Sequence, residues 1–180
     1  MSTKSLKNSI SIPPGVHLTV SGSVVAAEGE KGRVERDFGH TSATFTVENN
    51  TLSIEVPGSS KRARALLGTV TSIIEGMIVG VTKGYTYRLK MITSHFPITV
   101  KVERNKVVIE NFVGERHMRY ANIVGESRVT VMEDEIIVTG PDRESVGQTA
   151  ANIENACRIP RRDPRKFLDG IYIYQKGVGS

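Results

Sequence analysis

The stretch "PPGVHLTVSGSVVAAEGEKGRVERDF" (residues 13–38) decides the fold, because a second stretch, "FPITVKVERNKVVIENFVGERHMRY" (residues 96–120), resembles it. An offset of 83 residues aligns Val24-Val25 with Val107-Val108, Arg33 with Arg116 and Arg36 with Arg119. Each copy is long enough, and has enough alternating apolar and polar residues, to form its own core, unlike the short units of a solenoid. The sequence therefore predicts a tandem duplication, with an N-terminal repeat over residues 1–83 and a C-terminal repeat over residues 84–180.

Both copies show the same order of strands and helix. Apolar and polar residues alternate through residues 17–29 with a turn near Ser21-Gly22, and residues 31–38 predict a third strand. Residues 43–56 are typical of a hairpin that turns at residues 48–50, and Glu133-Asp134 takes that place in the second copy. We expect an α+β fold in which each repeat is a small antiparallel sheet covered by one helix.

Each hairpin is followed by a helical pattern. The first helix is expected to begin near Ser59-Ser60, which are good N-cap residues, and Gly84 to end it. The second begins after Asp142 and ends near Arg158. Apolar residues recur at helical spacing in both, at Ala63, Leu66, Leu67, Val70, Ile73, Ile74 and Met77 and at Val146, Ala150, Ile153 and Cys157. Strands are expected over residues 85–93 and 170–177, both in the second sheet.

Composition limits the classes of function. The net charge is +5 and the isoelectric point about 9.4, which favours an anionic partner such as nucleic acid. Cys157 is the single cysteine, so an intrachain disulfide and a cysteine-based metal site are excluded. The N-terminal residues lack the apolar run of a secretory signal. The most apolar window, residues 66–81, contains Glu75 and three glycines. We therefore expect that no segment has the length and apolarity of a membrane span, and we expect no membrane partner.

The search for enzyme chemistry finds little. The histidines are scattered at positions 17, 40, 95 and 117, without the spacing of a ligand pair. No glycine-rich phosphate loop follows a strand. Cys157 lies on the apolar helix stripe, which favours core packing over nucleophilic catalysis. We expect no enzyme, metal, cofactor or small-molecule substrate, although a pocket holding two titratable groups of the second repeat would revive a hydrolase or transferase reading.

The basic residues are more informative. Residues 158–176 carry six basic side chains against two acidic ones, a net charge of +4. The prolines at 160 and 164 exclude a continuous helix, so this stretch is expected to present arginines on an ordered turn, where the planar guanidinium suits phosphate. The predicted phosphate contacts are Arg158, Arg161, Arg162, Arg165, Lys166 and Lys176. A second cluster, "GERHMRY", adds Arg116, His117 and Arg119, with His117 and Arg119 on one face of an expected strand. A third cluster, "KRAR" at residues 61–64, is equally consistent with an ordinary solvated surface and with a binding role.

The C-terminal stretch "RDPRKFLDGIYIYQKG" resembles the signature of the large-subunit ribosomal protein six family. The residues that fill the signature are Arg162, Arg165, Phe167, Asp169, Gly170, Ile171, Tyr172, Ile173 and Lys176, while Asn155 stands where the signature has Gln. The motifs "EGEKGRVERDF", "IIEGMIVGVTKGY", "SHFPI" and "NFVGER" resemble its archaeal and eukaryotic branch, so the resemblance covers the whole chain.

The resemblance implies a duplicated α+β protein of the cytoplasmic ribosome. It implies binding of large-subunit rRNA near the sarcin–ricin loop by the C-terminal domain, with neighbouring ribosomal proteins and transient elongation GTPases nearby. Phe167 and Leu168 would then pack into the second core, and Asp169, Gly170 and Tyr172 would support the basic turn. The alternative hypothesis is an RNA-independent interaction module whose basic patch binds an acidic protein.

Overall fold

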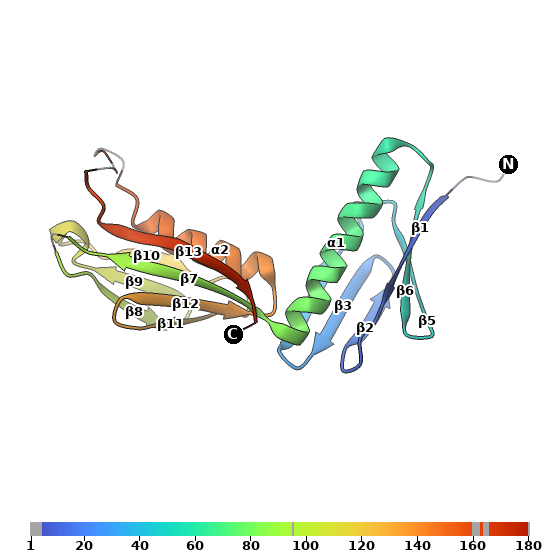
Figure 1. Ribbon diagram of the computed structural model, residues 1–180, viewed down its shortest axis with the longest axis horizontal. Helices are drawn as coiled ribbons and strands as arrows, with labels where there is room; N and C mark the ends of the chain where they lie inside the picture. The colour runs from blue at the N-terminus through green and yellow to red at the C-terminus, as the bar shows by residue number, and fades with distance from the viewer. Residues whose placement is uncertain (1–4, 95, 160–162, 164–165, 180) are drawn as a thin grey trace. The chain divides into compact units, whose positions relative to one another are not determined.

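The computed structural model describes residues 5–94, 96–159, 163 and 166–179 (Figure 1). The chain divides into two compact units, residues 1–83 and residues 84–180. Each unit combines antiparallel strands with one long helix, which confirms the α+β fold and its duplication.

Unit 1 contains two three-stranded sheets, with strand orders β1-β6-β5 and β2-β3-β4. The strands are β1 (Ser5–Ser11), β2 (His17–Ser21), β3 (Val24–Gly29), β4 (Gly32–Asp37), β5 (Thr44–Glu48) and β6 (Thr51–Pro57). Asn49 and Asn50 both have positive φ, which is the backbone that a two-residue hairpin turn between β5 and β6 requires. The helix α1 (Lys61–Lys83) packs against strands of both sheets, so one apolar core serves the whole unit.

The cap and the apolar stripe of α1 follow the sequence pattern. The Oγ atom of Ser60 accepts a hydrogen bond of 3.1 Å from the N–H of Ala63, as expected of an N-cap. Val70, Ile74 and Met77 are buried in the core, and Gly84 ends the helix with a φ of +78°. Both predicted ends of this helix are therefore confirmed.

The expectation that no segment has the length and apolarity of a membrane span is wrong for α1. Its 23 residues are long and apolar enough to cross a bilayer by those two criteria alone. The reason lies in the core, because the apolar side of α1, including Val70, Ile74 and Val81, covers the two sheets of unit 1. The helix is thus accounted for as the core helix of a folded domain.

Unit 2 repeats this arrangement and extends it. Its sheets have the strand orders β11-β12-β7-β13 and β10-β9-β8, and the helix packs against strands of both. The elements are β7 (Tyr85–Ile92), β8 (Thr99–Glu103), β9 (Lys106–Glu110), a short 3-10 helix η1 (Phe112–Gly114), β10 (Arg119–Asn122), β11 (Arg128–Val131), β12 (Glu135–Gly140), α2 (Arg143–Ala156) and β13 (Gly170–Val178). The carboxylate of Asp142 accepts hydrogen bonds from the N–H groups of Glu144 and Ser145, which confirms it as the N-cap of α2.

The final strand distinguishes the second unit from the first. β1 and β7 are counterparts, since each pairs antiparallel with the second strand of the hairpin that precedes the helix. β13 pairs with the other edge of β7, an edge that β1 leaves unpaired among the described residues of unit 1. A side chain of α2 fastens this strand, because Oε1 of Glu154 accepts from the N–H of Ile173 at 3.0 Å. The strand that follows the basic stretch is therefore bonded both to the sheet and to the helix.

The two units differ most between their second and third strands. In unit 1, Gly29 pairs with Gly32 across a tight turn, whereas in unit 2 Ile109 pairs with Arg119 across a loop that contains η1. The predicted strand through Arg116 and His117 is wrong, because both residues lie in a bend before β10. Asn111 and Val113 have positive φ in this loop, a geometry that interrupts strand pairing.

The ladder also corrects the alignment of the arginines. Arg36 stands opposite Val25, but Tyr120 stands opposite the equivalent Val108. Arg119 therefore occupies the position of Glu35 and not that of Arg36. The longer loop of unit 2 shifts the register by one residue, which reverses the face on which each side chain lies.

Candidate nucleic-acid interface

Several basic residues of the second unit lie where β7 ends and β13 begins. Gly170, the first residue of β13, pairs with Ile92, the last residue of β7. The loop of residues 111–118 lies at the same end, since Nδ2 of Asn111 donates to the carbonyl of Pro97 at 3.0 Å, in the segment that follows β7. We call this part of unit 2 the basic end, and it comprises residues 93–97, 111–118 and 158–169.

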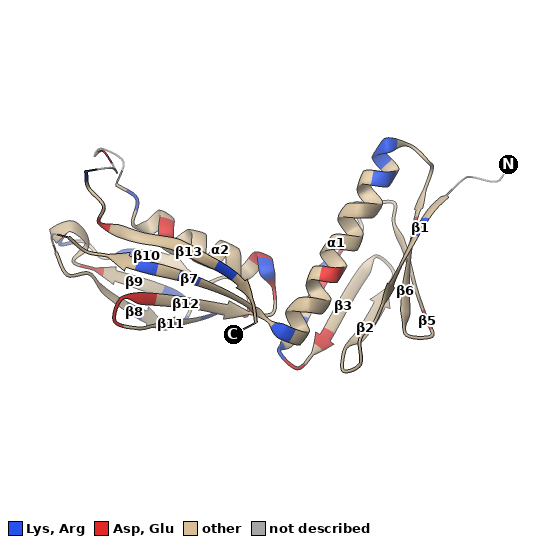
Figure 2. Ribbon diagram, viewed as in Figure 1, with Lys and Arg blue, Asp and Glu red and all other residues tan. Residues whose placement is uncertain are grey.

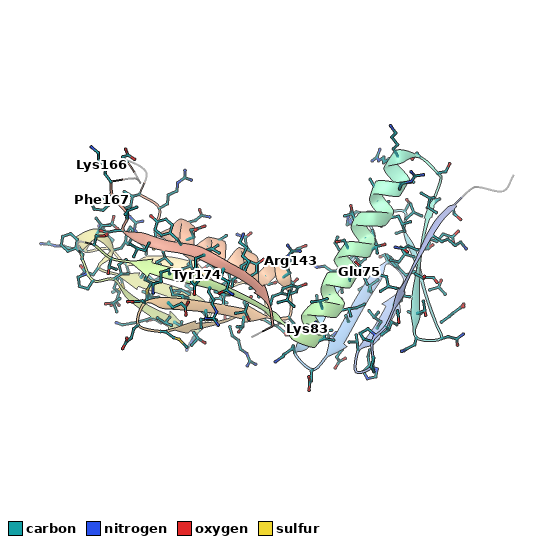
Figure 3. The ribbon with its side chains drawn as sticks, viewed as in Figure 1. Glu75, Lys83, Arg143, Lys166, Phe167 and Tyr174 are labelled. Carbon is teal, nitrogen blue, oxygen red and sulfur yellow. The ribbon has the colours of Figure 1, made fainter. Side chains whose placement is uncertain are left out.

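Four basic side chains of the basic end are described and exposed: Arg116, His117, Arg158 and Lys166. Figure 2 shows basic residues on the segment between α2 and β13, and Figure 3 places Lys166 and Phe167 on that segment just ahead of β13. The predicted contacts Arg161, Arg162 and Arg165 lie outside the described residues.

Arg119 makes the most side-chain hydrogen bonds recorded for a basic residue of this region. Its Nε and Nη2 atoms donate to the two carboxylate oxygens of Glu115 at 2.8 and 2.6 Å. Its Nη1 atom donates to the carbonyl of Ala156 at 2.8 Å and to that of Arg158 at 3.2 Å. The guanidinium also lies 4.5 Å from the ring centre of the buried Phe112. Arg119 therefore joins the loop of residues 111–118 to the end of α2.

The other end of the basic stretch is anchored by Asp169. This carboxylate is only 3% exposed and accepts a hydrogen bond from the N–H of Ser94, just beyond β7. Between the anchors, the N–H groups of Lys166 and Phe167 both donate to the carbonyl of Asp163, which makes a turn. The segment is thus bonded to the body of unit 2 before and after that turn.

Phe167 and Leu168, which precede Asp169, differ in burial. Phe167 is half-buried, but Leu168 is 52% exposed, so the prediction that it packs into the second core is wrong. Asp169 takes the inward position, because alternation along an extended chain allows only one of two neighbours to face the core. A Cβ atom at the next residue, Gly170, would lie 2.9 Å from the ring of Tyr172, so a larger residue there would require that ring to move.

Lys176 is not brought together with the other predicted contacts. It pairs with Tyr87 near the opposite end of β7, and its Nζ atom lies 5.7 Å from the ring centre of that tyrosine. Six residues of strand separate it from Gly170, a distance of about 20 Å. Lys176 is close to the basic stretch in sequence, but the extended strand between them separates the two in space.

The pKa values of three groups reflect the packing of this region. The hydrogen bond from Arg119 lowers the pKa of Glu115, and the same bond raises the pKa of Arg119, so the pair is charged on both sides. Burial raises the pKa of Cys157 to about 12. The thiol is therefore protonated at neutral pH, which agrees with the predicted packing role.

No metal-binding cluster is found among the described residues. Within them, no group of three or more His, Cys, Asp or Glu side chains is placed to hold a metal ion. His17 and His40 lie in unit 1 and His117 in unit 2, and His95 is outside the described part of the chain.

Sequence reasoning missed the two groups that hold the basic end together. Glu115 lies four residues before Arg119, a spacing at which opposite charges attract in a helix, but these residues are not helical. Ser94 contributes only a backbone N–H, for which no sequence signal exists.

Known proteins resemble this chain along most of its length. The family model described as "Ribosomal protein L6" matches residues 12–84 and again residues 96–170, once in each unit. "Large ribosomal subunit protein uL6" of Methanocella arvoryzae is 48% identical over 168 residues, which cover 93% of this chain and 95% of that protein. The proteins with the same name from Staphylothermus marinus and Aeropyrum pernix are 50% and 45% identical, with at least 93% of each chain covered.

Proposed function

Since the chain belongs to the ribosomal protein L6 family, a family of non-enzymatic proteins of the large ribosomal subunit, we propose that it binds large-subunit rRNA through the basic end of unit 2. On the ribosome, in the cytoplasm, it would also contact neighbouring ribosomal proteins. The family resemblance of the C-terminal signature supports a site near the sarcin–ricin loop, where the protein would support the landing of elongation GTPases.

One observation carries this proposal: the most basic stretch of the chain is fixed to unit 2 at both ends. Arg119 holds the carbonyl of Arg158 before the turn, and Asp169 bonds to the N–H of Ser94 after it. A segment that is tethered at both ends loses less conformational entropy when it binds than a free tail does. Folded RNA presents phosphates and 2′-hydroxyl groups at fixed spacing, which suits donors on a tethered segment.

Some of the proposed contacts are described by the structure, and the others are placed by sequence alone. Arg158, Arg116, His117 and Lys166 are exposed at the basic end, and Arg161, Arg162 and Arg165 lie between Arg158 and Lys166 in sequence. The arginines would donate paired hydrogen bonds to phosphate oxygens, while lysine supplies a point charge. Lys176 would contact a separate part of the RNA, because the structure places it near the far end of β13.

The test is binding of the full chain to a large-subunit rRNA fragment that contains the sarcin–ricin region, measured over a series of salt concentrations. The triple variant R161A/R162A/R165A is compared with K61A/R62A/R64A, which removes the same charge from the exposed start of α1. Each lost phosphate contact lowers the slope of log K against log salt by slightly less than one. We expect the first variant to lower the slope by about two to three and the second to leave it close to wild type.

The competing hypothesis of an acidic protein partner predicts a different outcome. Wild type would then bind the rRNA fragment no better than an unrelated RNA of equal length. If the two triple variants lose affinity equally, the binding depends on total charge and not on the basic end.

A further inference from the structure

We propose that Arg119 positions the RNA-binding surface and is not itself a phosphate contact; this inference rests on the proposed function. The sequence alone groups Arg119 with Arg116 and His117 as possible contacts. The structure separates them, because Arg116 and His117 are exposed whereas the Arg119 side chain is 23% exposed and bonded within the chain.

The hydrogen bonds of Arg119 leave it little capacity for a ligand. A guanidinium has five N–H groups, and four bonds run to Glu115, Ala156 and Arg158 at distances of 2.6 to 3.2 Å. Binding a phosphate with two parallel hydrogen bonds would therefore break at least one of them. One flat face of the group is also covered, since it lies 4.5 Å from the ring centre of Phe112, which is fully buried.

The same bonds give Arg119 a positioning role. The carbonyls of Ala156 and Arg158 belong to the last turn of α2 and its continuation, where a positive charge is favoured by the helix dipole. Glu115 is the residue directly before Arg116 and His117. Arg119 thus holds the exposed Arg116 and His117 at a fixed spacing from Arg158, although Arg119 and Arg158 are 39 residues apart in sequence.

The first unit provides an internal comparison. Arg119 stands opposite Ile109 in the ladder, and the residue at the equivalent position of unit 1 is Glu35, opposite Ala26. Glu35 is exposed and forms an ion pair of 3.0 Å with Arg33 of its own strand. An arginine is therefore found at this position in unit 2, which carries the basic stretch, but not in unit 1. This difference argues that the fold itself does not require an arginine there.

The direction in which one substitution changes the affinity for RNA separates the two roles. E115Q removes a negative charge beside the proposed RNA surface and releases part of Arg119, so a phosphate-contacting Arg119 predicts tighter binding. A positioning Arg119 predicts binding about threefold weaker, because a charge-assisted pair of hydrogen bonds is weakened. E110Q is the matched control, since Glu110 also holds one basic partner, Lys101, at 2.9 Å and makes no contact with Arg119 that the structure records. We expect E110Q to bind within about twofold of wild type, since it removes the same charge without disturbing the basic end.

A second pair of variants tests the geometry. R119K keeps the charge but not the planar fork, and R119M removes both. We expect both to weaken binding about tenfold, because neither side chain can make the paired bonds to Glu115, whereas a phosphate contact that depends on charge alone would tolerate R119K. Thermal unfolding confirms that each variant is folded, and the E115Q comparison decides the question if R119M is not. As an independent readout, the NMR signal of the Arg119 Nε–H group should keep its position when the rRNA fragment is added.

The outcomes distinguish this inference from the proposed function. Salt-sensitive binding by wild type, with E115Q weaker than E110Q, supports both. Binding by wild type with E115Q equal to or tighter than E110Q overturns the positioning role and leaves the rRNA function intact. A wild-type protein that does not bind the rRNA fragment overturns both.

Discussion

Replacing Gly29 by alanine should destabilise unit 1, while the same change at Gly68 should stabilise it. Gly29 ends β3 against the last part of α1, and a Cβ atom there would lie 2.7 Å from the carbonyl oxygen of Val81 and 3.1 Å from its Cγ2 atom. That carbonyl accepts the N–H of Lys31 at 2.9 Å, so the strand cannot move away without straining this bond. Overpacking of this kind costs about 1–3 kcal/mol.

Gly68 is the matched control, because it lies on the exposed side of α1 with nothing within 4 Å of an added Cβ atom. Alanine in an exposed helix interior is favoured over glycine by up to about 1 kcal/mol. The two substitutions add the same methyl group to the same unit, and only the surroundings differ. They should therefore change the free energy of unfolding in opposite directions.

The assay is urea unfolding followed by two signals. All five tyrosines lie in unit 2 and tryptophan is absent, so tyrosine fluorescence reports on unit 2 alone. Helical circular dichroism is weighted toward unit 1, since α1 has 23 residues and α2 has 14. With a slope near 1 kcal/mol per molar urea, G29A should lower the dichroism midpoint by about 1–3 M and leave the fluorescence midpoint in place. A G29A protein as stable as wild type would refute the packing argument, and a fluorescence midpoint that shifts equally would refute independent unfolding of the units.

Three further predictions concern unit 2. Asp142→Ala removes the N-cap of α2 and should cost about 1–2 kcal/mol in urea unfolding, a loss that Asp142→Asn should largely avoid. Cys157, with a pKa raised to about 12, should react slowly with a thiol reagent at pH 8 and fully in denaturant. Because the unfolded thiol ionises near pH 9.0, the free energy of unfolding should fall as pH rises above that value, and it should fall less in C157A. The lowered pKa of Glu115 means that the unfolded state binds more protons in acid, so the stabilising pair with Arg119 is lost as pH falls below about 4.5, and E115Q should flatten that part of the stability profile.

Much of the fold could be predicted because its signals are local. The hairpin at Asn49-Asn50, the caps at Ser60 and Asp142 and the stop at Gly84 each depend on a few neighbouring residues. The apolar stripes of the helices follow from periodicity alone. Elements of this kind are fixed by backbone preferences that act within one or two turns of chain.

The missed elements depend on contacts between distant segments. β1 was not predicted, because its apolar alternation is interrupted at Asn8, whose exposed side chain donates to Thr71 of α1 at 3.1 Å. The predicted strand through Arg116 and His117 is wrong, since nothing in the sequence shows that Ile109 pairs with Arg119. Without that pairing the register of β10, and hence the face of each side chain, is undetermined.

The sequence predicts which basic residues belong to the candidate site but not how they are arranged in space. Charge and the C-terminal signature identified Arg158 and Lys166, and the neighbouring cluster identified Arg116. The bonds that bring Arg116 near Arg158 are formed through Arg119 and Glu115, which sequence patterns do not reveal.

The central claim is that the basic end of unit 2 lies against rRNA in the large subunit. The most direct measurement is cleavage of rRNA by hydroxyl radicals generated from an iron chelate attached to the full chain at K166C, in subunits reconstituted with that protein. The buried Cys157 should remain unlabelled, and a chelate at T69C, on the exposed side of α1, is the comparison. If the basic end lies against rRNA, the chelate at position 166 should make strong cuts within a short stretch of rRNA at the sarcin–ricin region. Cuts from position 69 with none from position 166 would contradict that claim.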